Sequence, residues 1–202
     1  MEPMKMVITD RIRTAVCAQE PRRKSARKTA FYGMVTALGM VLSYVETLLP
    51  VYPGVPGVKP GLANIVVLLC LNRPYGSLRK NLPGAFLCGL TRILLSGFLF
   101  GNLFAIAYSL SGFFLSLAVE GLLTGISESP KTKVRFGVVS VSAAGGVAHN
   151  MGQLITAYFL CGKTVLLYLP WLILFGVGAG LLTGILGAIL IGRTEKVLPE
   201  CS

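Results

Sequence analysis

The sequence predicts an all-α integral membrane protein with six transmembrane helices, and three observations support this prediction. Hydrophobic residues make up 53% of the 202 residues and charged residues only 13%, about half the charged share of a soluble domain. The apolar runs are about 17–25 residues long, as in membrane-crossing helices, whereas a β-barrel shows shorter segments of alternating character. The basic residues are confined almost entirely to the segments between these runs.

The first 28 residues form a polar, basic segment that precedes the membrane domain. It contains the run PRRKSARK and has no short apolar core followed by a small-residue cleavage site, so we expect no signal peptide. We expect a cytoplasmic tail that is either simply solvated or held to anionic lipid, at about 1 kcal/mol per basic residue. The membrane domain then covers residues 29–193, and residues 194–202 form a short second tail.

The first predicted span, residues 29–49, combines a stripe of small residues with one acidic residue near its far end. Ala30, Gly33 and Ala37 recur at helical spacing, and such small side chains permit close contact with a neighbouring helix. Glu46 lies near the end of the span, and two interpretations of it are open. It is either a functional carboxylate or an interfacial residue.

A segment rich in proline and glycine, PVYPGVPGVKPG at residues 50–61, follows the first span. Its four prolines and three glycines exclude a regular helix, and its one charged residue is Lys59. The next apolar run, residues 62–72, is short for a membrane span. We therefore expect a second helix that begins within the loop or is a tilted or re-entrant piece.

Four more spans are predicted, at residues 83–100, 103–126, 137–160 and 165–192. Pro83 suits the first turn of the third span, and Gly101 with Asn102 makes a tight turn into the fourth. Small residues recur at helical spacing in the fourth and sixth spans, which predicts close helix packing there. These residues are Ser109, Gly112 and Ser116, and then Gly176, Gly180 and Gly184.

The basic residues also predict the orientation in the membrane. With six spans, sixteen of the 19 lysines and arginines lie in the terminal segments or in the loops on their side, and only Lys59 and Lys163 lie opposite. Cytoplasmic segments of membrane proteins carry an excess of lysine and arginine. We therefore expect a multi-pass protein of the cell (plasma) membrane with both termini in the cytoplasm and the proline/glycine loop outside.

Arg92 is the one basic residue within an apolar span. It lies about nine residues into its run, so a rise of about 1.5 Å per residue places it near the middle of the bilayer. A cation at that depth costs about 2.5–3.5 kcal/mol, so such residues are usually turned inward, paired and functional. The alternatives are a structural ion pair with Glu46 or Glu120, or a helix-end arginine whose side chain extends to the interface.

The fifth span carries His149, Asn150 and Gln153 within about one turn. A single polar residue often only hydrogen-bonds across helices, but three together at mid-membrane favour a function. The predicted solute-binding set is Arg92, Lys59, Asn64, Glu46, Asn102, His149, Asn150 and Gln153. Such a cationic, donor-rich set suits an anionic or heteroatom-rich ligand, because guanidinium groups bind carboxylates and phosphates in bidentate fashion. As alternatives, Lys59 is only solvated and Asn102 only caps or turns the chain.

Several function classes are excluded by missing motifs. There is no GxxxxGK[ST] sequence, so we expect no ATP hydrolysis by this chain. Asp10 is the only aspartate, so the chain has no aspartate-rich motif for the Mg²⁺–diphosphate complex of prenyl transfer. One histidine makes a poor transition-metal site, and the five cysteines form no CxxC motif and no close pair. We expect no catalytic residues, no metal ion, no cofactor and no nucleic-acid partner.

Three stretches of the sequence carry a family resemblance. They are VPGVKPGLANIVVLL (residues 55–69), TRILLSGFLFGNLFAIAYSLSG (residues 91–112) and AAGGVAHNMGQL (residues 143–154). Together they resemble the family described as "Gx transporter" or "heptaprenyl diphosphate synthase component I", over about residues 30–192. The chain departs from the family pattern at Pro60, where an aliphatic residue is expected, and in the length of its basic tail.

That family in turn resembles the S components of energy-coupling-factor (ECF) transporters. The resemblance implies a six-helix bundle that binds a vitamin or similar solute from outside and works with a membrane coupling subunit and cytoplasmic ATPases. In S components a small-residue stripe on the first helix contacts the coupling subunit, which implies that role for Ala30, Gly33 and Ala37.

Three functions are therefore open. The first is a solute-binding, S-component-like transporter subunit for a small anionic or vitamin-like solute. The second is a non-catalytic membrane subunit associated with polyprenyl (heptaprenyl) diphosphate synthase or quinone metabolism, since this chain lacks the catalytic carboxylates of the synthase reaction. The third is an assembly or scaffold membrane protein without a small ligand.

Overall fold

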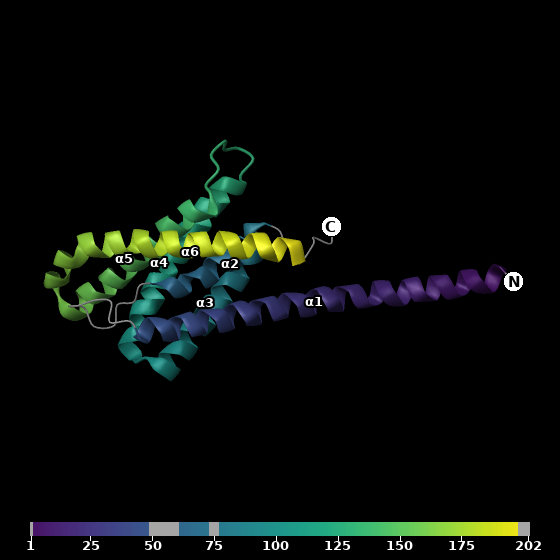
Figure 1. Cartoon of the computed structure of the whole chain (residues 1–202), viewed down its shortest axis with the longest axis horizontal. Helices are drawn as coiled ribbons and strands as arrows, with labels where there is room; N and C mark the ends of the chain where they lie inside the picture. Colours follow the sequence, from purple (N-terminus) through teal and green to yellow (C-terminus); the bar gives the residue numbers. More distant parts are fainter. Residues whose placement is uncertain (1, 49–60, 73–76, 198–202) are drawn as a thin grey trace. The chain divides into compact units, whose positions relative to one another are not determined.

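The computed structural model describes residues 2–48, 61–72 and 77–197, and the side chains of residues 25–48, 61–72 and 77–193. Within these ranges the chain is helical and contains no strand. Its elements are α1 (Glu2–Leu48), η1 (Leu62–Asn64), α2 (Ile65–Leu71), α3 (Leu78–Phe100), α4 (Leu103–Glu128), α5 (Val138–Cys161), η2 (Lys163–Tyr168) and α6 (Leu169–Val197) (Figure 1). The contacts divide the chain into two compact units, Met1–Met34 and Val35–Ser202. The predicted all-α fold class is confirmed.

Four helical segments are long and apolar enough to cross a membrane. They are Ser25–Leu48, Leu78–Phe100, Leu103–Glu128 and Lys163–Arg193. The protein is therefore a multi-pass membrane protein. Two predicted spans fall outside this set: α2 has only seven residues, and α5 has 24 residues but carries histidine, asparagine and glutamine that lower its hydropathy. The six-span arrangement stays a prediction.

Two helices begin earlier than the sequence suggests. α1 begins at Glu2, so the basic segment before residue 29 is helical rather than set apart from the first span. The prediction that Pro83 opens the third helix is wrong, because α3 begins at Leu78. The cause is a tertiary cap: the Leu78 N–H donates to both carboxylate oxygens of Glu128, at 3.1 and 3.0 Å. An anion at a helix N-terminus satisfies free N–H groups there.

The short helix α2 is the centre of the second unit. Every residue from Ala63 to Leu71 is buried, and α2 contacts α3, α4, α5 and α6. A helix that is apolar on all sides is stable only when it is surrounded. The fold also brings Cys70 of α2 and Cys88 of α3 together, with a hydrogen bond between their thiols. The two cysteines are not neighbours in sequence, so their spacing gave no sign of this contact.

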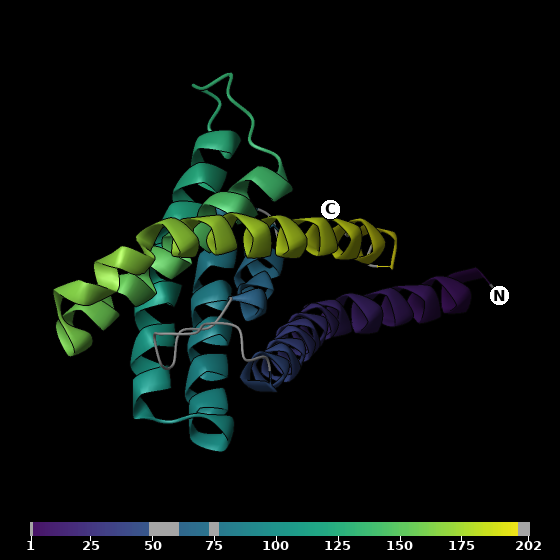
Figure 2. The same ribbon diagram turned by 60° about the vertical axis from the view of Figure 1, so that its left-hand side comes forward.

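The predicted glycine ladder lies where α6 packs along α5 (Figure 2). A Cβ atom added to Gly180 would lie 2.6 Å from the Ser142 carbonyl oxygen. A Cβ on Gly176 or Gly184 would lie 2.9 Å from the Cα atom of a residue of α5. Ser142 and Thr183 add a hydrogen bond of 2.9 Å between the two helices. The prediction of close packing by these glycines is confirmed.

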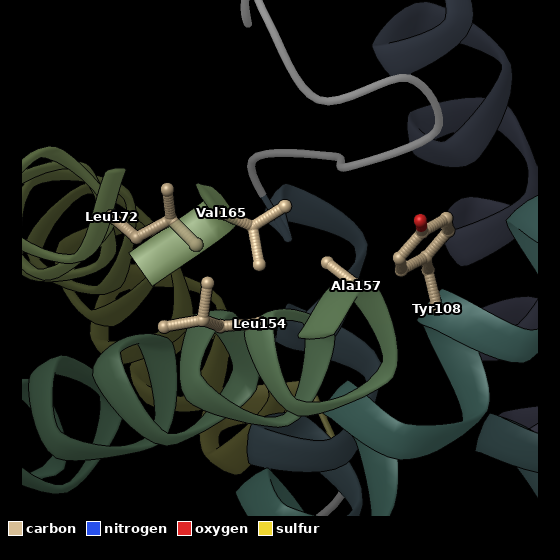
Figure 3. Close-up of a cluster of buried hydrophobic side chains, with 5 residues drawn as sticks. All are labelled: Tyr108, Leu154, Ala157, Val165 and Leu172. Carbon is tan, nitrogen blue, oxygen red and sulfur yellow. The ribbon is translucent and has the colours of Figure 1, made fainter. Parts of the chain in front are cut away.

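A cluster of buried apolar side chains closes one end of this helix pair. Tyr108 of α4, Leu154 and Ala157 of α5, Val165 of η2 and Leu172 of α6 form it (Figure 3). η2 follows Gly162, whose φ of 84° is a backbone conformation that favours glycine. The turn thus returns the chain from α5 to α6 and places Val165 between the two helices, facing Leu154 and Leu172 (Figure 3).

Candidate functional site

Arg92 of α3 lies inside the second unit, with only 4% of its surface exposed. Its Nη1 donates a hydrogen bond of 2.9 Å to Ser43 Oγ on α1, and its guanidinium interacts electrostatically with Glu46. Its aliphatic stem lies over Gly39, where an added Cβ would be 2.6 Å from Arg92 Cδ. A glycine on α1 therefore makes the space that a mid-helix arginine needs.

Glu46 connects α1 to the start of the second apolar segment. Its carboxyl is buried, and Oε1 accepts a hydrogen bond of 3.2 Å from the backbone N–H of Ala63 in η1. The next residue, Asn64, turns the other way and donates 2.6 Å and 2.7 Å hydrogen bonds to Ser116 Oγ and Glu120 Oε1 of α4. The short turn η1 is thus held between two buried carboxyl groups.

His149 contacts the chain on either side of it through two glycines. A Cβ atom added to Gly61 would lie 2.9 Å from His149 Cδ2, and one added to Gly112 of α4 would lie 2.8 Å from His149 Nδ1. Gly61 also has a φ of 81°, so any side chain there is disfavoured twice. His149 Nε2 is 2.8 Å from Gln153 Nε2, and Arg92 acts on the ring electrostatically. The side chain of His149, which belongs to α5, thus lies between α4 and the end of the proline/glycine loop.

These side chains form one buried polar cluster in a predominantly apolar bundle. Its members are Ser43, Glu46, Asn64, Arg92, Ser116, Glu120, His149 and Gln153, and each is at most 5% exposed. They come from α1, η1, α3, α4 and α5. Polar and ionisable groups within a membrane are costly, and they mark ligand, ion or proton sites.

A comparison with protein-family models matches residues 35–190 to heptaprenyl diphosphate synthase component I. The chain belongs to this family. The matched range contains the whole buried polar cluster and begins at the first residue of the second unit. No curated protein and no solved structure matches the chain.

For this member of the heptaprenyl diphosphate synthase component I family, the structure groups most of the predicted solute-binding residues. Arg92, Glu46, Asn64, His149 and Gln153 belong to the buried polar cluster. The electrostatic partner of Arg92 is Glu46, which was one of the two partners considered.

Two predicted residues lie elsewhere, and a third falls outside the described part of the chain. Asn150 donates a 2.8 Å hydrogen bond to the Leu172 carbonyl, so it joins α5 to α6. Asn102 is exposed and caps α4, and Lys59 lies outside the described residues.

Sequence reasoning missed Ser43, assigned Ser116 only to a packing stripe, and treated Glu120 only as a possible partner of Arg92. One signal was available, because Ser116 and Glu120 are four residues apart and therefore share a face of a helix. Their partner Asn64 lies 52 and 56 positions away along the chain. That contact depends on how α2 packs, which periodicity does not reveal.

The predicted partner-binding stripe is exposed. In the first unit, Ala30 and Gly33 are exposed, and a Cβ added to Gly33 would meet nothing within 4 Å. In the second unit, Ala37 is exposed as well. The contact of these residues with a coupling subunit stays a prediction.

Two substitutions of Asn102 can distinguish a structural role as the cap of α4 from a role in ligand binding. Its Oδ1 accepts a hydrogen bond of 2.8 Å from the Ala105 N–H, so Asn102→Ala should lower the free energy of unfolding by about 1 kcal/mol. Asn102→Asp keeps the acceptor and should match the wild type. Thermal unfolding in detergent measures both variants. If Asn102→Asp is fully stable but loses a small molecule that co-purifies with the wild type, Asn102 binds that molecule directly.

Proposed function

We propose that this protein is the solute-binding, S-component-like subunit of an ECF-type transporter, with six membrane-crossing helices, and that it takes up a small anionic or vitamin-like solute from outside. The observation that carries this proposal is that the guanidinium of Arg92 is buried between helices and has N–H donors that are not used in hydrogen bonds. Its one hydrogen bond within the described residues runs from Nη1 to Ser43, and its buried Nε has no partner there. An arginine offers five N–H donors.

A carboxylate or phosphate group matches these unused donors. Guanidinium groups bind such anions through two parallel hydrogen bonds, and a low local dielectric strengthens them. His149 and Gln153 add further polar atoms from α5. Glu46, the nearest opposing charge, accepts from the Ala63 N–H, which orients one of its oxygens toward η1.

The path of the chain supports an outward-facing site. In the proposed orientation, both termini are cytoplasmic and the proline/glycine loop is outside. Gly61, the last residue of this loop, contacts the ring of His149, and two residues later the Ala63 N–H donates to Glu46. Without a nucleotide-binding motif, the chain needs ATPases and a coupling subunit as partners, and Ala30, Gly33 and Ala37 are the proposed contact.

One observation favours the second function, a non-catalytic membrane subunit associated with a polyprenyl diphosphate synthase. An apolar groove of about 840 Å³ lies between α3 and α4. Its lining residues are Leu78, Leu82, Pro83, Phe86, Leu87, Phe114, Leu117, Ala118, Gly121 and Leu122. A groove without charges suits a prenyl or acyl chain. It does not include Arg92, so we rank this function second.

Native mass spectrometry of the gently purified protein tests the two functions. We expect the wild type to carry a small polar or anionic solute. The test variant is His149→Gln, which keeps a polar side chain in the cluster. It should weaken retention of the solute without removing the protein from the membrane. A retained prenyl diphosphate or quinone would favour the synthase-associated function instead. A protein that carries neither would contradict both and support a scaffold role.

A further inference from the structure

A second buried carboxyl group, that of Glu120, is not used by the proposed solute site. Glu120 is completely buried within α4. Its Oε1 accepts hydrogen bonds from Asn64 Nδ2 at 2.7 Å and from Ser116 Oγ at 3.2 Å. The same side chain fills the space over Gly145 of α5, where an added Cβ would overlap it. Within the described part of the chain, this carboxyl group therefore contacts only uncharged groups.

The charged and titratable groups around Glu120 are engaged elsewhere. On α3, Arg92 is bonded to Ser43 and interacts with Glu46 of α1. On α5, His149 lies one turn beyond Gly145 and contacts Gly112, two turns from Glu120 along α4. Among the residues that the structure describes, no cation therefore lies against Glu120.

The buried thiols of Cys70 on α2 and Cys88 on α3 form a hydrogen bond with one another. These thiols therefore provide no positive charge to Glu120 either.

An ionised carboxyl group in this position would be a buried charge with only uncharged partners among the described residues, and such groups neutralise instead. The two carboxyl oxygens are also unequal. Oε1 accepts two hydrogen bonds, whereas Oε2 has no partner among the described residues. One turn further, the buried hydroxyl oxygen of Thr124 has no partner there either. No described donor is bonded to Oε2, so this oxygen is the one that can carry a proton.

We propose that Glu120 is a proton-binding site within the membrane domain, with the proton on Oε2 and with Asn64 and Ser116 holding Oε1. The three-residue turn η1 then links this site to the solute site. Asn64 of η1 bonds to Glu120, and its neighbour Ala63 bonds to Glu46 beside Arg92. Release of the proton would leave a buried carboxylate and strengthen the hydrogen bonds that Asn64 and Ser116 donate to it. A coupling of proton release to solute movement rests on the proposed function, whereas the proton site does not.

Infrared difference spectroscopy of the full-length protein in lipid vesicles tests the site without any solute. The chain has only eight acidic residues, so the spectrum of the wild type minus that of Glu120→Gln isolates one carboxyl group. At neutral pH we expect the C=O stretching band of a protonated acid, which shifts in D₂O and is the same in sodium and potassium buffers. The matched control, Glu46→Gln, should remove a carboxylate band and leave the acid band in place.

Two results would overturn the proposal. One is a difference spectrum with carboxylate bands only, and the other is an acid band that disappears on addition of Na⁺, since the site would then hold a sodium ion. Ser116→Ala serves if Glu120→Gln does not fold. It removes one hydrogen bond to Oε1, so the acid band should move to higher frequency, and an unmoved band would show that it belongs to another residue. Loss of solute binding with a normal acid band would contradict the proposed function alone.

Discussion

Replacing Arg92 by methionine should lower the free energy of unfolding by about 3–5 kcal/mol, and adding Glu46→Gln should restore most of this loss. Arg92 and Glu46 are both 4% exposed and interact electrostatically. Removing the guanidinium alone takes away a cation that stabilises the buried carboxylate of Glu46. Removing both charges leaves an uncharged pair of similar volume. Unfolding of the four proteins of this double-mutant cycle, measured in the same detergent, gives the coupling energy between the two residues.

The same double variant separates binding from stability at Arg92. If Arg92 holds the solute, the stable Arg92→Met/Glu46→Gln protein should still lose the molecule that co-purifies with the wild type. Glu46→Gln alone is the reference for the loss of the carboxylate. A double variant that keeps the solute would show that Arg92 serves only as half of a structural ion pair, and the proposed anion site would then be wrong.

Substitution of Gly180 by leucine should lower the free energy of unfolding by about 3 kcal/mol and reduce the amount of folded protein in the membrane. The physical reason is a backbone contact. A Cβ at this position would lie 2.6 Å from the Ser142 carbonyl oxygen and 2.7 Å from the Ala143 Cα atom. Neither atom belongs to a side chain that can rotate away, so α5 and α6 would have to separate.

Gly178 provides a matched control two residues away in the same helix. A Cβ there would meet nothing within 4 Å, and the residue is exposed. Gly178→Leu should therefore express and unfold as the wild type does. It is a matched control because both variants replace a glycine of the same helix by leucine and so add the same apolar volume. Fluorescence-detected size exclusion of the two variants after heating makes the comparison. Equal behaviour of both would mean that the Gly180 face does not pack against α5.

Much of this architecture could be predicted because it depends on local rules. Apolar runs ended where α3, α4 and α6 end or nearly so, and Gly101 and Asn102 indeed form the turn between two helices. The glycine ladder of α6 was recognisable because a four-residue spacing places side chains on one face of any helix. Arg92 was singled out for a similar reason, since a charge in an apolar run has an energetic cost wherever the helix lies.

Other features were missed because they depend on contacts between distant segments. The start of α3 at Leu78 requires the Glu128 carboxylate from the end of α4. Asn150 looked like a site residue beside His149, but neighbouring positions on a helix point about 100° apart, and Asn150 bonds to α6. The thiol contact of Cys70 with Cys88 likewise depends on the packing of α2 against α3.

The sequence by itself determined that this protein is a helical, multi-pass membrane protein, which helices pack through small residues, and that Arg92 requires a partner. These conclusions follow from composition, length and period, which act within single segments. Only the tertiary structure decided that Glu46 is that partner, that Asn64 joins Glu120, and that η1 lies between the two carboxyl groups. The reason is that α2 is apolar on every side. The residues of α2 predict only that it must be buried. Which polar groups meet at its end depends on how the surrounding helices pack against it.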